Sequence, residues 1–219
     1  MGSYSYTEAV NHMLLVSGEH LINNLSAEAG VDISVAEFIL KQTIKTYQLR
    51  GLANNRYVTT IAPDVNGKIN LPSLACYAQV VEPLFDPTTG EVIQTTLKSN
   101  PTRLFNITKQ TDVFTQSLDV EVIVLLGNEA SKYGWDDIDS PLQRAIMETA
   151  AREYQMITQG DINIDKRLAM QEQVFVSRGR ASDIFKKNRS IFLGDPGTRA
   201  AVNRRGILSN DPYFTRTRF

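Results

Sequence analysis

The hydrophobic period of this chain changes twice, and this constrains the fold more than any other feature of the sequence. Apolar residues recur at helical spacing up to Arg50, alternate with polar residues between Tyr57 and Leu126, and return to helical spacing after Gly134. Side chains return to the same side of a helix about every 3.6 residues and to the same face of a strand every second residue. A segment with one of these apolar patterns therefore cannot bury its apolar side chains in the other conformation. The sequence therefore predicts an α+β fold with helices at both ends and strands between them.

Two helices are predicted in the first quarter of the chain. The first covers residues 7–17. The second begins at Asp32 or Ser34, whose side chains can accept a hydrogen bond from the first turn, and ends at Arg50 before Gly51. Apolar residues on two sides of the second helix indicate that other elements cover it on both sides.

Two further helices are predicted near the C-terminal end. The run Ser140-Pro141-Leu142-Gln143 combines an N-cap serine, a proline at the first helical position and a glutamine placed for a capping box. The last helix begins near residues 161–165, where acidic side chains suit the positive end of the helix dipole. Its length of about 28 residues corresponds to a rod of roughly 42 Å, which is long for a domain of this size.

The middle of the chain predicts short antiparallel strands that form a compact sheet or small barrel. Asn66-Gly67 is typical of a type I′ hairpin turn, which would return the chain from a strand over 58–61 to a strand over 68–71. In the last strand, residues 118–126, every second residue is apolar, and Asp119 and Glu121 give the first half a polar face. The remaining predicted strands cover residues 77–81, 91–97 and 102–107.

From this order of elements we expect an antiparallel four-helix bundle with an inserted antiparallel β domain and an extended C-terminal tail. The bundle comprises residues 1–55 and 135–193, because helices from both ends of the chain can share one core. The β domain covers residues 56–134. The tail covers residues 194–219, where no hydrophobic period is sustained.

Charge is unevenly distributed along the chain. The formal net charge is −1, with 23 basic and 24 acidic residues, yet residues 161–219 contain an excess of six basic groups. The first 160 residues therefore have an excess of seven acidic groups. This balance argues against a protein whose whole surface binds nucleic acid, and it predicts an acidic body with a basic end that meets a partner. A solvated basic helix face is the alternative interpretation.

Candidate catalytic and metal-binding groups are few. His12 and His20 are insufficient for a zinc site or a histidine-based triad, and Cys76 has no second cysteine to pair with. We therefore expect no enzyme activity, no cofactor and no metal. We also expect a soluble protein without a membrane segment, because no run of apolar residues approaches the length of about 18 that a membrane helix needs.

The C-terminal tail combines arginine with aromatic residues. Guanidinium groups pair with carboxylates through two parallel hydrogen bonds and aromatic rings fill apolar pockets, so this composition is typical of binding hot spots. The same residues are also compatible with nucleic-acid binding through phosphate contacts and stacking, or with a solvated terminus. The residues predicted to dock on a partner are Arg199, Arg204, Arg205, Tyr213, Phe214, Arg216, Arg218 and Phe219.

Short motifs follow one another in a defined order along residues 7–192. The N-terminal ones are Ala9-Val10-Asn11, Gly18-Glu19 and Arg50-Gly51-Leu52, and the central ones are Ile61-Ala62-Pro63-Asp64 and Gly67-Lys68-Ile69-Asn70-Leu71-Pro72. The C-terminal ones are Tyr133-Gly134-Trp135 and Ala150-Ala151-Arg152-Glu153-Tyr154. In order and spacing they resemble the motifs of tail tubular protein A, the head-to-tail adaptor family of short-tailed phages (podoviruses). Leu52 stands where that family has an aromatic residue.

The resemblance implies a structural role in the virion, after synthesis in the host cytoplasm. Such adaptors form a ring, of about twelve copies, beneath the portal. They continue the DNA channel to the tail nozzle and help anchor the tail fibres. The implied partners are further copies of the chain, the portal, nozzle and fibre proteins, and genomic DNA that passes through without specific binding. The tail would reach into the portal, and the long last helix would pack in the ring through Phe175, Arg178, Phe185 and Phe192.

Two other functions are compatible with the residues. The basic aromatic tail would suit a nucleic-acid-binding module, whose affinity would fall steeply as the salt concentration rises. A hydrolase built in the β domain would need a pocket that joins carboxylates such as Glu82, Asp86 and Glu91.

Overall fold

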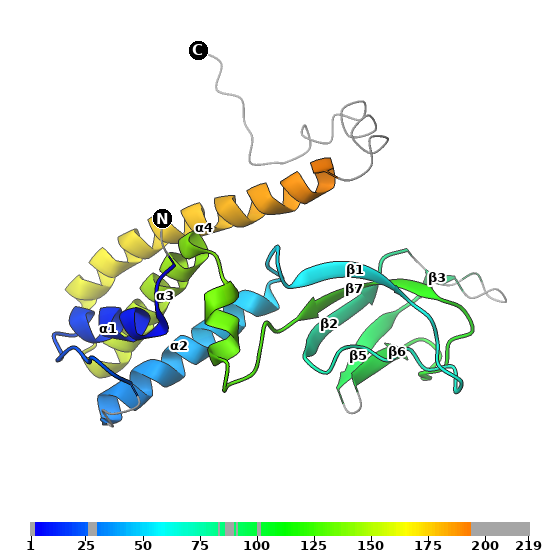
Figure 1. The fold of residues 1–219 in the computed structure, drawn as a ribbon, viewed down its shortest axis with the longest axis horizontal. Helices are drawn as coiled ribbons and strands as arrows, with labels where there is room; N and C mark the ends of the chain where they lie inside the picture. Colours follow the sequence, from blue (N-terminus) through cyan, green and yellow to red (C-terminus); the bar gives the residue numbers. More distant parts are fainter. Residues whose placement is uncertain are drawn as a thin grey trace, which may run out of the picture.

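The computed structural model describes residues 3–25, 30–82, 84–85, 90, 92–99 and 102–193, with side chains described up to Lys186. Helices and strands are both present, which confirms the predicted α+β class. Figure 1 shows the helices gathered at one end of an elongated molecule and the strands at the other. The chain crosses from the helical end to the strands after residue 50 and returns after residue 124.

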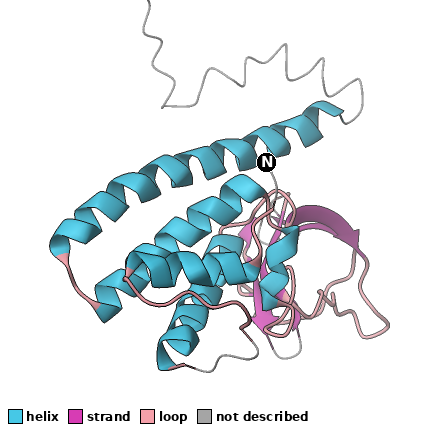
Figure 2. Ribbon diagram, turned by 60° about the vertical axis from the view of Figure 1, so that its left-hand side comes forward, coloured by secondary structure: helices cyan, strands magenta, loops and turns pink. Residues whose placement is uncertain are grey.

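The helical part consists of α1 (Tyr6–Val16), α2 (Val31–Leu49), the 3₁₀ segment η1 (Lys132–Asp137), α3 (Ser140–Thr158) and α4 (Ile162–Leu193). α3 contacts α1, α2 and α4, and α1 also contacts α2. α4 lies along the outside of this group, and its C-terminal end extends beyond the other helices (Figure 1 and Figure 2). Its 32 residues exceed the predicted length and correspond to about 48 Å.

α2 begins earlier than predicted. Its N-cap is Gly30, and not Asp32 or Ser34. The Gly30 carbonyl accepts hydrogen bonds from the backbone N–H and from the hydroxyl of Ser34, both at 3.1 Å. The Ser34 hydroxyl is therefore a donor within the first turn and does not cap it, which is a common alternative use of serine in helices.

α3 begins one residue earlier than predicted, after Asp139 instead of Ser140. The predicted capping box at Ser140 and Gln143 is therefore wrong. The buried Gln143 side chain accepts the Tyr4 N–H at 3.0 Å, and its Nε2 donates to the Trp135 carbonyl at 2.9 Å. This amide joins the start of the chain to η1, a long-range role that a local sequence pattern does not reveal.

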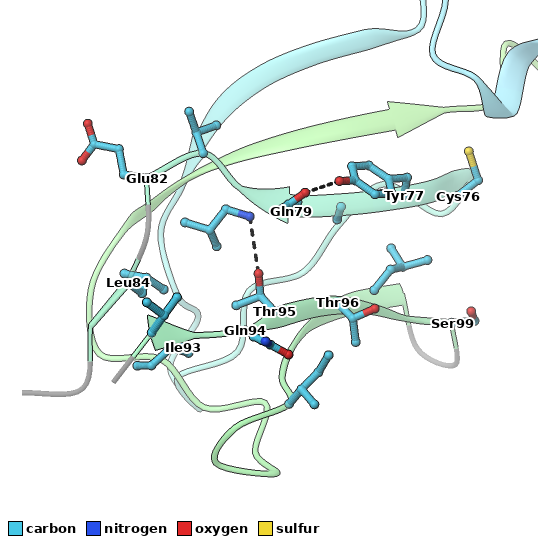
Figure 3. Close-up of a pocket in the computed structure, with 16 residues that line it drawn as sticks. Cys76, Tyr77, Gln79, Glu82, Leu84, Ile93, Gln94, Thr95, Thr96 and Ser99 are labelled. Atoms are coloured by element: carbon cyan, nitrogen blue, oxygen red, sulfur yellow. Dashed lines mark hydrogen bonds between the residues drawn. The ribbon is translucent and has the colours of Figure 1, made fainter. Parts of the chain in front are cut away.

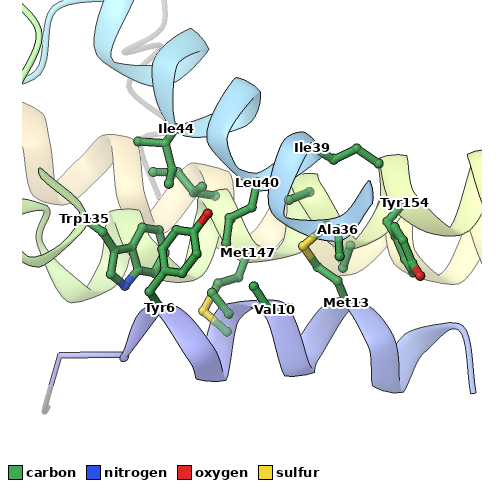
Figure 4. Packing of buried hydrophobic residues seen from close by; sticks show 14 of the residues in the cluster. Tyr6, Val10, Met13, Ala36, Ile39, Leu40, Ile44, Trp135, Met147 and Tyr154 are labelled. Atoms are coloured by element: carbon green, nitrogen blue, oxygen red, sulfur yellow. The ribbon is translucent and has the colours of Figure 1, made fainter. Parts of the chain in front are cut away.

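One hydrophobic core lies between the helices and draws on both ends of the chain. Met13 of α1, Leu40 of α2 and Met147 of α3 lie together in it, and Trp135 of η1 closes one end (Figure 4). The Trp135 indole N–H donates to the Tyr4 carbonyl at 2.7 Å, which satisfies the one polar atom of the ring inside the core. Helices that are separated by the strands in sequence therefore share a single apolar interior.

Within the described residues, the strand-rich part contains three small antiparallel sheets. β7 is the centre of the first, in the order β1-β7-β2, and the other two are the hairpins β3-β4 and β5-β6. A second hydrophobic cluster, which includes Ala78, Leu104 and Val120, joins the first sheet to the β5-β6 hairpin. The strands are β1 (Arg56–Ile61), β2 (Ala75–Val80), β3 (Leu84–Phe85), β4 (Val92–Ile93), β5 (Thr95–Ser99), β6 (Thr102–Asn106) and β7 (Leu118–Val124).

The hairpin predicted at Asn66-Gly67 is wrong. β1 pairs with β7 instead of residues 68–71, and only Gly67 of the two turn residues has a positive φ, at 75°. The Asp64 carboxylate accepts hydrogen bonds from the Asn66 and Lys68 N–H groups at 2.8 and 2.9 Å, which closes a wider loop. The residues after this loop bond to β6, so long-range pairing and not the turn decides the register.

β7 confirms the alternation predicted for its residues. Val120 and Val122 are buried in the strand-side cluster, and Asp119 between the apolar positions is exposed. Ile123 points the other way and is buried next to the end of α2, where a Cβ on Gly51 would come within 3.0 Å of its Cδ1. One face of β7 therefore packs on the strand-side cluster. The opposite face, at its C-terminal end, packs against the helical part through Ile123.

Candidate interaction surfaces

A network of charged groups holds α4 on α3. The Arg152 guanidinium of α3 donates to Asp165 (Nε to Oδ1, 2.6 Å) and to Glu172 (Nη1 to Oε2, 2.9 Å), both on α4. The Thr149 hydroxyl also donates to Glu172, at 2.9 Å. The hydrogen bonds from Arg152 lower the pKa of Asp165 below its usual range, and the same bonds raise the pKa of Arg152. These pairs determine which side of α4 faces α3.

Close backbone packing continues the contact along α4. A Cβ added at Gly179 would lie 3.2 Å from the Ala145 Cβ and 3.2 Å from the Pro141 carbonyl oxygen. The absence of a side chain at Gly179 therefore lets α4 approach the first turns of α3 more closely than a larger residue would allow.

The C-terminal half of α4 has two further anchors. The buried Asp183 carboxylate accepts the Ala53 N–H at 2.7 Å, and Lys186 forms an ion pair with Asp139, the N-cap of α3. Ala53 lies in the connection from α2 to β1. α4 is thereby tied to the place where the chain leaves the helical part.

The side of α4 that points away from α3, here named the outer face, displays exposed apolar side chains. Met170 and Phe185 are 69% and 68% exposed, and Val174 and Ile184 are about half exposed. At about 100° per residue these four positions fall within an arc of about 100°, roughly opposite the buried Leu168, so they share one side of the helix. These side chains form an interrupted apolar stripe, which is more typical of an interaction site than single exposed apolar residues are.

The four residues predicted to pack in a ring have different surroundings. The Phe175 ring is half-buried between two guanidinium groups, with Arg144 at 4.9 Å and Arg178 at 5.6 Å from its centroid. Phe185 is exposed on the outer face. Phe192 belongs to α4, but its side chain lies outside the described part of the chain. Phe175 is thus engaged within its own chain, and Phe185 is accessible to a neighbour.

The docking residues predicted in the tail all lie beyond the described part of the chain. They are Arg199, Arg204, Arg205, Tyr213, Phe214, Arg216, Arg218 and Phe219. α4 ends at Leu193, so the tail begins directly after the anchored helix.

A buried carboxylate lies between α1 and α3. Glu148 is 1% exposed, with Oε2 3.4 Å from His12 Nε2 and Oε1 2.6 Å from Arg144 Nη2. Burial by itself would raise the pKa of Glu148, but the hydrogen bonds and charges of His12 and Arg144 outweigh it, and the pKa lies below its usual range. The sequence analysis did not single out Glu148. The feature of the sequence that could have identified Glu148 is its four-residue spacing from Arg144, which places the two side chains next to each other on a helix.

A hollow of about 780 Å³ opens between β2 and β5 (Figure 3). Tyr77 and Gln79 of β2 line one side, and Thr95 and Leu97 of β5 line the other. At one end the Val80 N–H donates to the Thr95 hydroxyl at 3.4 Å. The hollow is therefore bounded by two strands that face each other edge to edge.

Of the groups considered for catalysis, Cys76 and Glu82 line this hollow. The Cys76 thiol donates to the Ile123 carbonyl at 3.2 Å, and partial burial raises its pKa, which disfavours the nucleophilic thiolate. Glu82 is exposed at the rim, and Asp86 and Glu91 lie outside the described residues. Among the described residues, no group of three or more histidine, cysteine or acidic side chains could hold a metal ion. In the same part of the chain, no helix has both the length and the apolar character of a membrane span.

Comparison with known families places the fold in context. A family model described as tail tubular protein matches residues 7–184, which extend from α1 through most of α4. No individual curated protein matches the chain. The matched region contains the helical core, the strand-rich part, and the charged and close-packed contacts that hold α4 on α3.

Proposed function

Because this chain belongs to the tail tubular protein family, we propose that it is the head-to-tail adaptor of a short-tailed phage. The family consists of structural proteins of the phage tail and is not an enzyme family. The observation that carries the proposal is the family match over residues 7–184. The order of motifs resembling tail tubular protein A supports the adaptor role in particular.

In this proposal copies of the chain form a ring of about twelve, with α4 as the contact between neighbours. Helices α1 to α4 act as an antiparallel four-helix bundle made of residues 1–55 and 135–193, and the β domain of residues 56–134 projects from it. The exposed Met170, Val174 and Phe185 support a contact on the outer face. Full burial of one such side chain typically contributes about 1.5–3 kcal/mol, so several together would stabilise a ring.

The tail of residues 194–219 is proposed to dock on the portal. Its arginine and aromatic residues suit a protein partner with carboxylates and apolar pockets. Asp183 and Lys186 anchor the helix that ends directly before the tail. The remaining surfaces are proposed to meet the nozzle and the tail fibres.

Genomic DNA is proposed to pass through the ring without specific binding. The first 160 residues have an excess of acidic groups. An acidic channel wall would repel phosphates and let the duplex slide, whereas a basic wall would bind it in a salt-dependent manner.

Electron microscopy of the purified chain with portal and nozzle proteins tests the proposal. We expect rings that join the two partners. A chain ending at Leu193, which keeps all of α4, is expected to form rings but to lose portal binding. Equal portal binding by the shortened and full-length chains would overturn the tail assignment. Loss of salt-dependent DNA binding on shortening, with portal binding retained, would favour a nucleic-acid-binding module instead.

A further inference from the structure

The side of α2 that points away from the helical core carries exposed apolar side chains of its own. Val31, Phe38 and Leu49 are 79%, 62% and 46% exposed. They are seven and eleven residues apart, which is about two and three helical turns, so they lie on one side of the helix. That side is roughly opposite Leu40, which is buried in the helical core. These three residues are named the α2 stripe.

The apolar pattern of α2 predicts that other elements cover this helix on two sides. In the structure one side packs on α1, α3 and η1. Among the described residues, the other side is open to solvent, with the large aromatic ring of Phe38 at its centre. An aromatic side chain exposed within an apolar stripe indicates a surface that becomes buried in an assembly.

The α2 stripe and the outer face of α4 lie on opposite sides of the helical part. α3 contacts both α2 and α4. Figure 1 shows α4 along the upper side of the helical part and α2 along its lower side, with α3 between them. The outer face points away from α3, and the α2 stripe points away from the core that α3 helps to form. One chain can therefore offer one surface to a copy on one side and the second surface to a copy on the other.

The two surfaces match in length. The outer face of α4 extends over fifteen residues, from Met170 to Phe185, which corresponds to about 22 Å. The α2 stripe extends over eighteen residues, from Val31 to Leu49, or about 27 Å. Two helices that pack side by side can therefore bring the apolar side chains together along the whole outer face.

Charges beside the outer face disfavour contact between two copies of α4. Exposed basic residues flank it, namely Lys166, Arg167 and Arg180. The acidic residues Asp165 and Glu172 are on the opposite side of α4, where they pair with Arg152. Packing two outer faces against each other would therefore bring like charges together, which costs free energy.

The charges around the α2 stripe are nearly balanced. Three acidic and two basic residues lie on the exposed turns of α2 or bond to them, namely Asp32, Glu37, Glu129, Lys41 and Lys45. Lys41 is paired with Glu129 at 3.4 Å, and Asp32 offers an exposed carboxylate. The basic flanks of α4 meet less repulsion here than on a second α4. The charge pattern therefore favours α4 of one copy on α2 of the next.

We propose that the outer face of α4 packs on the α2 stripe of a neighbouring copy. The contact is heterologous, so each copy presents α4 to one neighbour and α2 to the other, which is the arrangement that can close into a ring. Phe38 of one copy is then buried against the apolar side chains of α4 on the next. This inference rests on the proposed ring and adds to it the surface that receives α4.

Mixing two variants tests this pairing. Val31→Asp with Phe38→Asp blocks the α2 stripe, and Met170→Asp with Phe185→Asp blocks the outer face of α4. Analytical ultracentrifugation should show each variant alone as a monomer, at concentrations where the unmodified chain forms rings. An equimolar mixture should contain dimers of one copy of each, because one intact α4 then meets one intact α2. The dimers also show that both variants are folded.

The control and the contrary outcomes separate this inference from the ring itself. Asn66→Asp with Ser73→Asp, at exposed positions in the strand-rich part, should still form rings. Rings from the α2 variant, dimers of either variant alone, or monomers in the mixture would each overturn the pairing while the rings of the unmodified chain stand. An unmodified chain that stays monomeric would overturn the ring and the pairing together.

Thiol labelling gives a second readout in rings of the chain alone, where another copy is the partner present. Phe38→Cys, in a chain with Cys76→Ser, should react on the order of tenfold more slowly in rings than in dilute monomers, because the centre of an interface excludes solvent. Ser73→Cys in the same background should react at the same rate in both states. Equal rates at position 38 in rings and monomers would overturn the proposal.

Discussion

The Asp183 carboxylate on α4 accepts the backbone N–H of Ala53 at 2.7 Å, although the two residues are 130 positions apart in the sequence. Ala53 lies between α2 and β1, where the chain passes from the helical part to the strands. The outermost helix is thus fixed to the junction of the two parts. The ion pair between Lys186 and Asp139 also fixes this end of α4 to the N-terminus of α3.

Replacing Asp183 with alanine is expected to loosen the C-terminal half of α4. A buried N–H that loses its acceptor costs about 1–3 kcal/mol, so the free energy of unfolding should fall by that amount. Amide exchange should increase around residues 180–186 more than in α1. Glu153→Ala, at an exposed position on α3, is the control. Unchanged exchange in α4 would show that the Ala53 contact does not hold the helix.

Replacing Gly179 with valine is expected to push α4 away from α3. The new side chain would overlap the space of Ala145 and Pro141, and overpacking of this kind costs about 1–3 kcal/mol. Ala181→Val introduces the same β-branched residue at an exposed position two residues away and should change the stability little. Thermal unfolding of both variants distinguishes the two positions; equal melting temperatures would contradict the close approach at Gly179.

Acid is expected to destabilise the protein partly through Glu148. Its pKa in the folded chain is lowered, so its contribution is fully present above the unfolded value of about 4.3 and is lost as the pH falls through the lower folded pKa. Glu148→Gln should reduce the free energy of unfolding by about 2 kcal/mol at neutral pH, and the difference from the unmodified chain should narrow toward pH 3 or so. Chemical denaturation across this range measures the effect.

The exposed Glu153 on the same helix provides the matched control for this pH dependence. Glu153→Gln should leave the curve of stability against pH nearly unchanged, because an exposed carboxylate contributes little. If the free energy of unfolding of Glu148→Gln differed from that of the unmodified chain by the same amount at every pH, Glu148 would not contribute to acid unfolding.

Aspartate on the outer face of α4 is expected to prevent ring formation without unfolding the chain. Met170→Asp with Phe185→Asp removes two exposed apolar side chains and adds charges that would be buried between neighbours. Analytical ultracentrifugation should then show monomers, while circular dichroism stays that of the folded chain. Gln171→Asp, exposed beside the stripe, should still form rings. If the double variant still formed rings, neighbouring copies would have to contact one another through a surface other than the outer face of α4.

The elements that local patterns specify well were predicted with small errors. The helices around Met13, Leu40 and Leu168 and the strand around Val120 appear where their periodicity indicated, because each repeats its apolar positions over several turns or residue pairs. The errors occur at ends and turns, and at residues 68–71, which form isolated bridges instead of the predicted strand. Gly30 is the N-cap of α2 and Asp139 that of α3, because Ser34 and Gln143 make other hydrogen bonds.

The candidate surfaces were less predictable than the elements. Of the residues predicted to pack in a ring, Phe185 is exposed, but Phe175 is held between Arg144 and Arg178, and no pattern in the sequence places those two side chains around one ring. The hollow between β2 and β5 could not be predicted either. It exists because β1 and β2 both pair with β7, which leaves β2 at an edge opposite Thr95.

By itself the sequence determined the class of each segment, since a helical or alternating period of apolar residues dictates which conformation can bury them. It also determined the family, through the order of its motifs. Only the tertiary structure decided which strands pair, which side of α4 faces α3, and where buried charges such as Glu148 find partners. Those outcomes depend on contacts between residues far apart in the chain, and their energies arise only once folding has brought the groups together and removed the water between them.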